Sequence, residues 1–143
     1  MARLESLIRY HKHDLDEKRK HLGNLNSQAT ELENQLDTLE KQKDKEAELA
    51  KTEPLLGQAY SNYLVGYKKM KATLLNQRAE LEKEIEAALF EIQEKFTELK
   101  KYEVLHEKRL KEKRIQEQKE EDKAFDEMAL EIYERKKKEK TEQ

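Results

Sequence analysis

Apolar side chains in the first third of the chain recur in alternating steps of four and three residues. Eleven positions keep this spacing, and nine of them are apolar: Leu4, Ile8, His11, Leu15, Lys18, Leu22, Leu25, Ala29, Leu32, Leu36 and Leu39. A repeat that averages 3.5 residues keeps one seam of a helix facing a partner helix over many turns. The pattern therefore predicts a coiled coil rather than a surface helix of a globular domain.

The first seam fades after Leu39, and the only proline of the chain follows at Pro54, with Gly57 close behind. Because proline cannot continue a helix but is tolerated in the first turn of a new one, this stretch predicts a break between two helices. A second seam opens with tyrosines and slips by one residue near Leu81, which resembles a stutter. Its positions are Tyr60, Tyr63, Tyr67, Met70, Leu74, Gln77, Leu81, Ile85, Ala88, Ile92, Phe96 and Leu99.

The two seams predict an all-α fold, in which two long helices form one antiparallel coiled-coil hairpin over residues 1–143. We expect a helix over about 3–50, a turn over about 52–59 and a helix over about 60–135. With that turn, Leu4 should lie opposite about position 107, so the second helix overhangs the first by roughly 36 residues, or about 54 Å at 1.5 Å per residue.

A short apolar stripe returns within this overhang. Its members are spaced i, i+3, i+4, i+7 and i+8, which places them on one helical face: Phe125, Met128, Ala129, Ile132 and Tyr133. Nothing inside the predicted hairpin is positioned to cover this face. The stripe must therefore be covered by protein, either by a different partner or by a second copy of the overhang.

Composition narrows the possible functions. Charged residues make up 43% of the 143 residues and hydrophobic ones 35%, so the chain lacks the apolar mass of a layered globular core. Without cysteine there is no disulfide or thiolate zinc site, and the few glycines are too scattered for a phosphate-binding loop. No stretch approaches the roughly 20 apolar residues that span a bilayer. We expect a soluble cytoplasmic protein without a cofactor.

Candidate sites for other chemistry are weak. His11 and His13 are two residues apart and point to different helix faces, whereas helical metal ligands sit three or four apart. Carboxylate pairs abound, but a hairpin of two helices offers no cleft that desolvates one partner. The run Lys136 to Lys138 lies among glutamates and lacks the sustained basic face that nucleic acid requires. We expect no enzyme activity, no metal and no nucleic-acid partner.

Three of the six tyrosines, Tyr60, Tyr63 and Tyr67, share the second seam just after the predicted turn. They support two interpretations, which the sequence leaves open. The rings either pack over the tip of the coiled coil or form a docking patch, since tyrosine is frequent in binding hot spots.

The chain also resembles a known family. The segment Leu4 to Leu7 opens a heptad helix, Tyr63 stands near the start of the second helix, and Phe125 to Ala129 follow the Lys/Arg/Glu/Gln-rich stretch 108–119. Together these features resemble the FliJ family of flagellar export proteins, over nearly the whole chain.

The resemblance implies a stalk-like coiled coil that inserts in a hexameric export ATPase and promotes its assembly and hydrolysis. It also implies contacts with the cytoplasmic domain of the export gate and with export chaperones, at the cytoplasmic face of the inner membrane. The gate-contacting pair of the family falls on about Tyr63 and Tyr67, although tyrosine stands here where an aliphatic residue is usual. We expect Phe125, Met128 and Ile132 to pack in the ATPase ring.

Two alternatives remain. One is the stalk protein of a virulence type III secretion system, which has similar physics and different partners. The other is a structural scaffold that dimerises in parallel through residues 4–39, although Pro54 and Gly57 speak against an uninterrupted rod.

Overall fold

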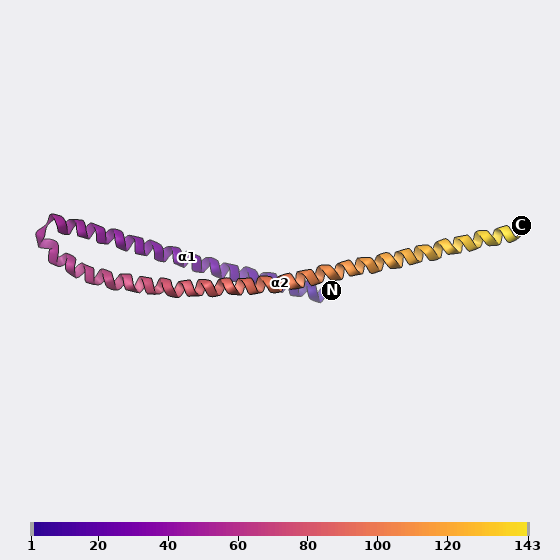
Figure 1. Cartoon of the computed structure of the whole chain (residues 1–143), viewed down its shortest axis with the longest axis horizontal. Coiled ribbons are helices and arrows are strands. Elements are labelled where there is room, and N and C mark those ends of the chain that lie inside the picture. Colours follow the sequence, from indigo (N-terminus) through magenta and orange to yellow (C-terminus); the bar gives the residue numbers. More distant parts are fainter. Residues whose placement is uncertain (1, 143) are drawn as a thin grey trace. The chain divides into compact units, whose positions relative to one another are not determined.

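The computed structural model describes residues 2–142 and contains two long helices joined by a short turn. Helix α1 spans Ala2–Thr52, the 3₁₀ turn η1 spans Pro54–Leu56 and helix α2 spans Gly57–Glu142 (Figure 1). No residue of this described range belongs to a strand. The predicted all-α helical hairpin is confirmed.

The connection between the helices is shorter than the predicted turn over about 52–59. Only Glu53 leaves the helical region, with φ −131° and ψ 110°, because the ring of Pro54 disfavours helical geometry in the residue before it. The backbone N–H of Leu56 donates to the Glu53 carbonyl oxygen at 3.1 Å. Gly57 already has helical angles, φ −57° and ψ −43°, so α2 begins there rather than near residue 60.

Contacts along the chain group into two units. We call residues 10–97 the hairpin unit; the other unit combines the residues up to Arg9 with those from Glu98 onward. The single hairpin domain over 1–143 stays a prediction, and each unit is described by itself.

Ion pairs between α1 and α2 show that the hairpin unit is antiparallel. As the position of the α1 partner rises along the chain, that of the α2 partner falls. The N···O distances are 3.3 Å for Asp14 with Lys95, 3.1 Å for Lys18 with Glu91, 3.0 Å for Glu33 with Arg78 and 2.9 Å for Glu40 with Lys71.

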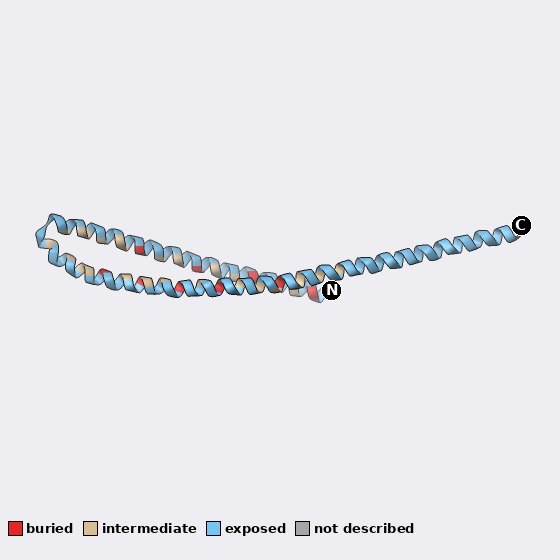
Figure 2. Ribbon diagram, in the orientation of Figure 1, coloured by how far each residue is buried: buried red, intermediate tan, exposed pale blue. Residues whose placement is uncertain are grey.

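The core of the hairpin unit is narrow: the buried positions recur at intervals along both helices, with exposed positions between them (Figure 2). Leu25, with 3% of its surface exposed, packs with Leu81 and Ala88 at its centre. All eleven seam positions predicted in α1 are buried or half-buried, which confirms the first seam.

The second seam differs from the prediction at three positions. Met70 is 52% exposed, Phe96 is 44% exposed, and Gln77 is also exposed. From 67 to 95 the line of buried and half-buried positions in α2 instead keeps steps of four and three without a slip: 67, 71, 74, 78, 81, 85, 88, 92 and 95. Leu75 is half-buried beside this line, and Tyr60, Tyr63 and Leu64 are half-buried before it. The predicted stutter near Leu81 is therefore wrong.

The reason is that charged side chains occupy the seam where apolar neighbours were expected. Lys71, Arg78 and Lys95 are half-buried, and each reaches an acidic residue of α1. Long basic side chains can lay their apolar stems along a seam while the charged tip stays at its edge. The heptad register thus continues through these positions although their terminal groups are polar.

In the other unit, the first turns of α1 contact the middle of α2. Leu4, Ile8 and Leu99 are buried, and His106 Nε2 lies 3.8 Å from Glu5 Oε1. This contact agrees with the expected position of Leu4 opposite residue 107. From Lys111 to Thr141 every residue is exposed, and we call residues 111–142 the tail.

Candidate functional site

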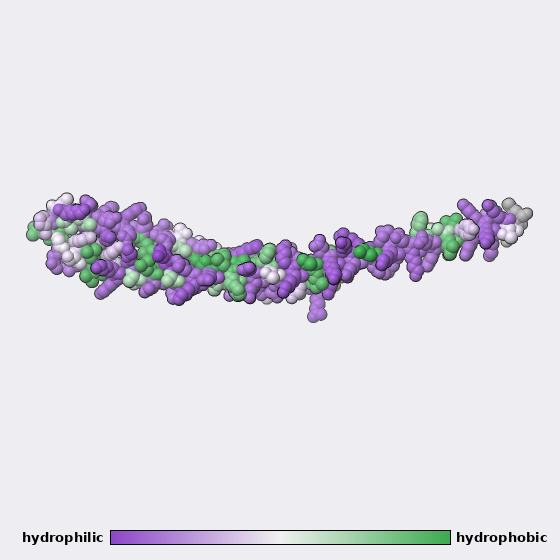
Figure 3. Space-filling model, viewed as in Figure 1, coloured by the Kyte–Doolittle hydropathy of each residue, from purple (hydrophilic) through white to green (hydrophobic). Residues whose placement is uncertain are grey.

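The tail presents an apolar face to solvent. Its five side chains, which we call the tail face, are Phe125, Met128, Ala129, Ile132 and Tyr133, and all of them are exposed. The exposed fractions reach 72% for Phe125 and 61% for Met128. In the space-filling view this region forms a green patch among purple hydrophilic residues near the C-terminal end (Figure 3).

A helix that leaves such a face open usually binds protein, because contiguous exposed apolar surface is rare on soluble chains without that role. The face is also isolated along the tail. From 111 to 124 the only large apolar residue is Ile115, which is 49% exposed. The sequence predicted this face from its spacing, and within its own unit the structure leaves it uncovered.

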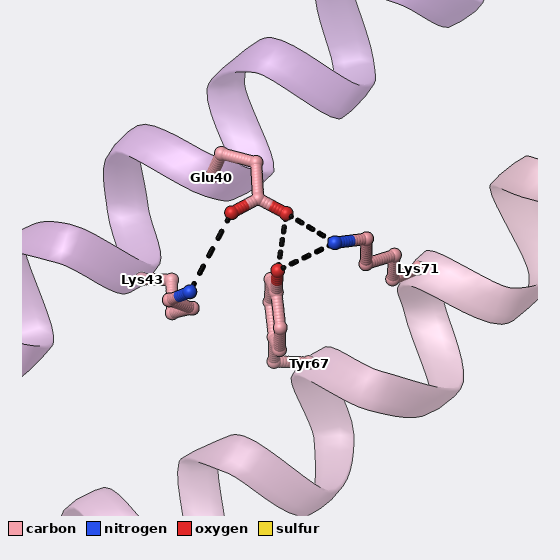
Figure 4. Close-up of polar contacts among 4 residues, drawn as sticks. All are labelled: Glu40, Lys43, Tyr67 and Lys71. Atoms are coloured by element: carbon pink, nitrogen blue, oxygen red, sulfur yellow. Dashed lines mark hydrogen bonds and ion pairs between the residues drawn. The ribbon is translucent and has the colours of Figure 1, made fainter.

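Tyr67 lies in the interhelical seam rather than on an open surface. It is 7% exposed, and its hydroxyl donates a hydrogen bond to Glu40 Oε1. Lys71 Nζ donates to the same hydroxyl at 3.3 Å, and Lys43 Nζ stands 5.2 Å from the centre of the ring (Figure 4). The tyrosine therefore joins α1 and α2.

Hydrogen bonds from Tyr67 and Lys71 stabilise the ionised carboxylate of Glu40. The hydrogen bond from the Tyr67 hydroxyl is the largest cause, followed by the hydrogen bond from Lys71, and together they lower the pKa of Glu40 to about 2. The same contact with Glu40 raises the pKa of Lys71. This cluster is part of the coiled-coil seam, so its contacts hold α1 against α2.

Tyr63 is half-buried one turn earlier in α2. Its hydroxyl is buried and has no hydrogen-bond partner among the described residues. Burial raises the pKa of Tyr63, and the negative charge of Glu46 raises it further. Of the two interpretations of the tyrosines, the structure supports packing for Tyr67 and leaves Tyr63 partly open to a partner.

Two exposed aliphatic side chains near the turn belong to neither apolar repeat of the sequence. Leu55, within η1, is 94% exposed, and Val65, in the first turns of α2, is 56% exposed. A detectable signal existed for Leu55, because an apolar residue directly after the proline of a tight turn has little chance of burial. Val65 lies between seam positions and belongs to no recognisable period.

Other kinds of site find no support in residues 2–142. This range contains no cluster of three or more histidine, aspartate or glutamate side chains that could hold a metal ion. Nor does any helix of the described chain combine the length and apolar character needed to cross a membrane.

Comparison with known protein families gives a match over most of the chain. A family model described as "FliJ: Flagellar FliJ protein" matches residues 1–138. No curated protein matches the chain. No solved structure matches it either.

Proposed function

Because the chain belongs to the family of flagellar FliJ proteins, we propose that it acts as a non-enzymatic stalk within the flagellar protein-export apparatus. The family confirms the resemblance seen in the sequence and makes the chain a flagellar export-related protein. The finer proposal concerns its partners. In it, the tail enters the ring of a hexameric export ATPase, promotes ring assembly and hydrolysis, and connects the ring to the export gate and to export chaperones.

The observation that carries this proposal is the tail face. A single helix with its side chains is about 10–12 Å wide, which suits insertion into the centre of a ring. Phe125, Met128 and Ile132 project from one side of such a helix and are uncovered within their unit. Contact with the inner wall of the ring would remove this apolar surface from water, which favours binding by about 25 cal/mol per Å².

The turn region is the second proposed contact, with the cytoplasmic domain of the gate. Tyr63 supplies a half-buried ring with an unpartnered hydroxyl, and Leu55 and Val65 supply exposed aliphatic surface. Tyr67 supports this contact only indirectly, since its buried ring joins α1 to α2 through Glu40. The protein reaches the membrane only through these partners.

The test is ATP hydrolysis by the purified export ATPase, with hexamer formation followed by sizing. Replacing Phe125→Ala together with Met128→Ala should reduce stimulation at least tenfold, because two side chains at the centre of an interface often contribute more than 1 kcal/mol each. The matched control is Leu130→Ala. Leu130 is 60% exposed but lies about 140° around the helix from Phe125.

Normal stimulation by the double variant, or equal loss in the control, contradicts insertion through the tail face.

A pull-down with the gate domain tests the proposed contact at the turn region. Leu55→Ser with Val65→Ser should weaken gate capture without changing stimulation of the ATPase, and unchanged capture removes the turn contact from the proposal.

The virulence secretion alternative has no observation in its favour, because the matching family is flagellar. The parallel scaffold also loses support, since α1 already pairs with α2 of the same chain through its whole seam.

A further inference from the structure

Charge is distributed unevenly on the two sides of the tail face. Residues 117–127, which precede or enter it, contain six acidic and two basic side chains. Residues 130–140, which end or follow it, contain three acidic and five basic side chains. The apolar face thus lies between an acidic segment and a basic segment of the same helix.

These charges are available for a partner. Among the described residues, no ion pair involves a side chain between 111 and 141. Side-chain hydrogen bonds here stay within the helix, such as the one from Gln118 to Asp122 at 3.1 Å. Glu121, Arg135 and Lys136 are exposed and unpaired in this range.

We propose that the tail face binds the tail face of a second copy of this chain, with the two helices antiparallel and related by a two-fold axis near Met128 and Ala129. Phe125 then faces Ile132 of the second copy. The same symmetry places Glu121 against Lys136 of the second copy, and Asp122 against Arg135 of the second copy. Each acidic segment lies on the basic segment of the other copy, twice per dimer.

The charges favour this orientation over a parallel one. A two-fold contact uses the same surface on both copies, so the surface must be complementary to itself. A parallel pair would set acidic segment beside acidic segment and basic beside basic, and like charges at such spacing are destabilising. Only the antiparallel pair brings the two apolar faces together and also places acidic side chains of one copy beside basic side chains of the other.

The contact is small, because five side chains on one helix bury less than the roughly 1,200 Å² of a standard specific interface. We therefore expect a weak dimer that dissociates further as salt screens its exposed charges. The ATPase ring and the second copy compete for the same face in the proposed function. The dimer itself does not depend on the ring, so either proposal can fail alone.

The first experiment is sedimentation velocity on the full chain at low and high salt, over a concentration series. One variant carries Glu121→Lys with Asp122→Lys, and a second carries Arg135→Glu with Lys136→Glu. Each variant alone should have a dimer dissociation constant raised at least about tenfold, because both ends of its interface now repel. Mixed in equal amounts, the two variants should dimerise with each other about as well as the wild type.

The control for net charge is Glu86→Lys with Glu94→Lys, two exposed positions of the hairpin unit, which should leave self-association unchanged. A wild-type chain that stays monomeric up to millimolar concentration overturns the proposal, as does a mixture of the two reversed variants that fails to pair. Self-association that survives Phe125→Glu also overturns it.

Direction is tested by crosslinking, which the absence of native cysteine makes simple. With a short bismaleimide, Glu121→Cys and Lys136→Cys should each give little crosslinked dimer alone and a strong heterodimer band when mixed. Self-crosslinking of Lys136→Cys without the mixed product would show a parallel pair and overturn the antiparallel arrangement.

Discussion

The hairpin unit and the tail are both helical and both rich in Lys and Glu, yet the apolar stripe is buried in the hairpin unit and exposed in the tail. Leu25 in the hairpin unit is 3% exposed, whereas Phe125 in the tail is 72% exposed. Both residues belong to apolar stripes with helical spacing. The difference is that a second helix of the same chain covers the first stripe, while the unit containing the second stripe supplies no cover. The spacing reveals a face, and the partner decides whether that face is a core or a binding surface.

The sharpest way to test this contrast is to remove one large side chain from each stripe. Leu25→Ala should lower the free energy of unfolding by about 2–5 kcal/mol, because it leaves a cavity beside Leu81 and Ala88. Phe125→Ala should change it by less than about 0.5 kcal/mol, as expected for an exposed position. Urea unfolding followed by circular dichroism measures both.

A loss of stability in Phe125→Ala comparable with that of Leu25→Ala would mean that the tail face is covered within the monomer. The chain must be diluted until any dimer dissociates, since binding between copies adds apparent stability.

A second test concerns the polar contacts of the hairpin seam, which have no equivalent in the tail. The pKa of Glu40 is lowered from 4.5 to about 2, chiefly by the hydroxyl of Tyr67. A folded-state pKa below the unfolded one gives stability that is fully present above about pH 4.5 and is lost as pH falls from there through about 2. Tyr67→Phe should raise this pKa towards 4.5 and flatten that part of the pH profile.

Carboxyl carbon chemical shifts from NMR give the Glu40 titration, and urea unfolding between pH 2 and pH 5 gives the stability. Phe125→Ala serves as the control and should leave the Glu40 curve unchanged. A Glu40 titration midpoint near 4.5 in the wild type would show that the Tyr67 contact does not persist in solution.

The smallest effect is expected for the exposed ion pairs. Arg78 lies 3.0 Å from Glu33, with 39% and 58% of the two side chains exposed. Replacing Arg78→Met keeps an apolar stem over the seam and removes the charge, so the loss should stay within about 1 kcal/mol. Unfolding midpoints at two salt concentrations measure it, and a loss as large as that of Leu25→Ala contradicts the assignment of seam stability to apolar burial.

The first seam could be predicted from the sequence because leucine occupies most of its positions and the steps never change. The second seam could not be predicted fully, because at three turns of α2 two neighbouring residues fit the repeat. The expected seam residues were Met70, Gln77 and Phe96, whereas the half-buried residues are the basic neighbours that follow or precede them: Lys71, Arg78 and Lys95. The prediction of the more apolar neighbour was wrong at these turns. The aliphatic part of each basic side chain packs on the seam, and its charged group forms an ion pair with an acidic residue of α1.

The binding surfaces show a similar limit. The tail face followed from spacing alone, and the structure leaves it exposed as expected. Tyr67 was expected near an exposed tip, but it is buried against Glu40 and Lys43 of α1. These residues lie 27 and 24 positions earlier in the chain, so no local sequence pattern predicts the contact. Leu55 belongs to neither apolar repeat, because the turn interrupts both seams.

The central claim is that the tail face becomes covered when the chain meets the export ATPase. Amide hydrogen exchange measures this directly, with the full chain alone and with the ATPase hexamer. Alone, the tail should exchange much faster than residues 10–97, because an isolated helix without packing is marginal in water. With the ATPase, residues 120–139 should gain protection while the hairpin unit stays unchanged. Protection that appears only around residues 55–65, or a tail that exchanges equally fast with and without the ATPase, would contradict the claim.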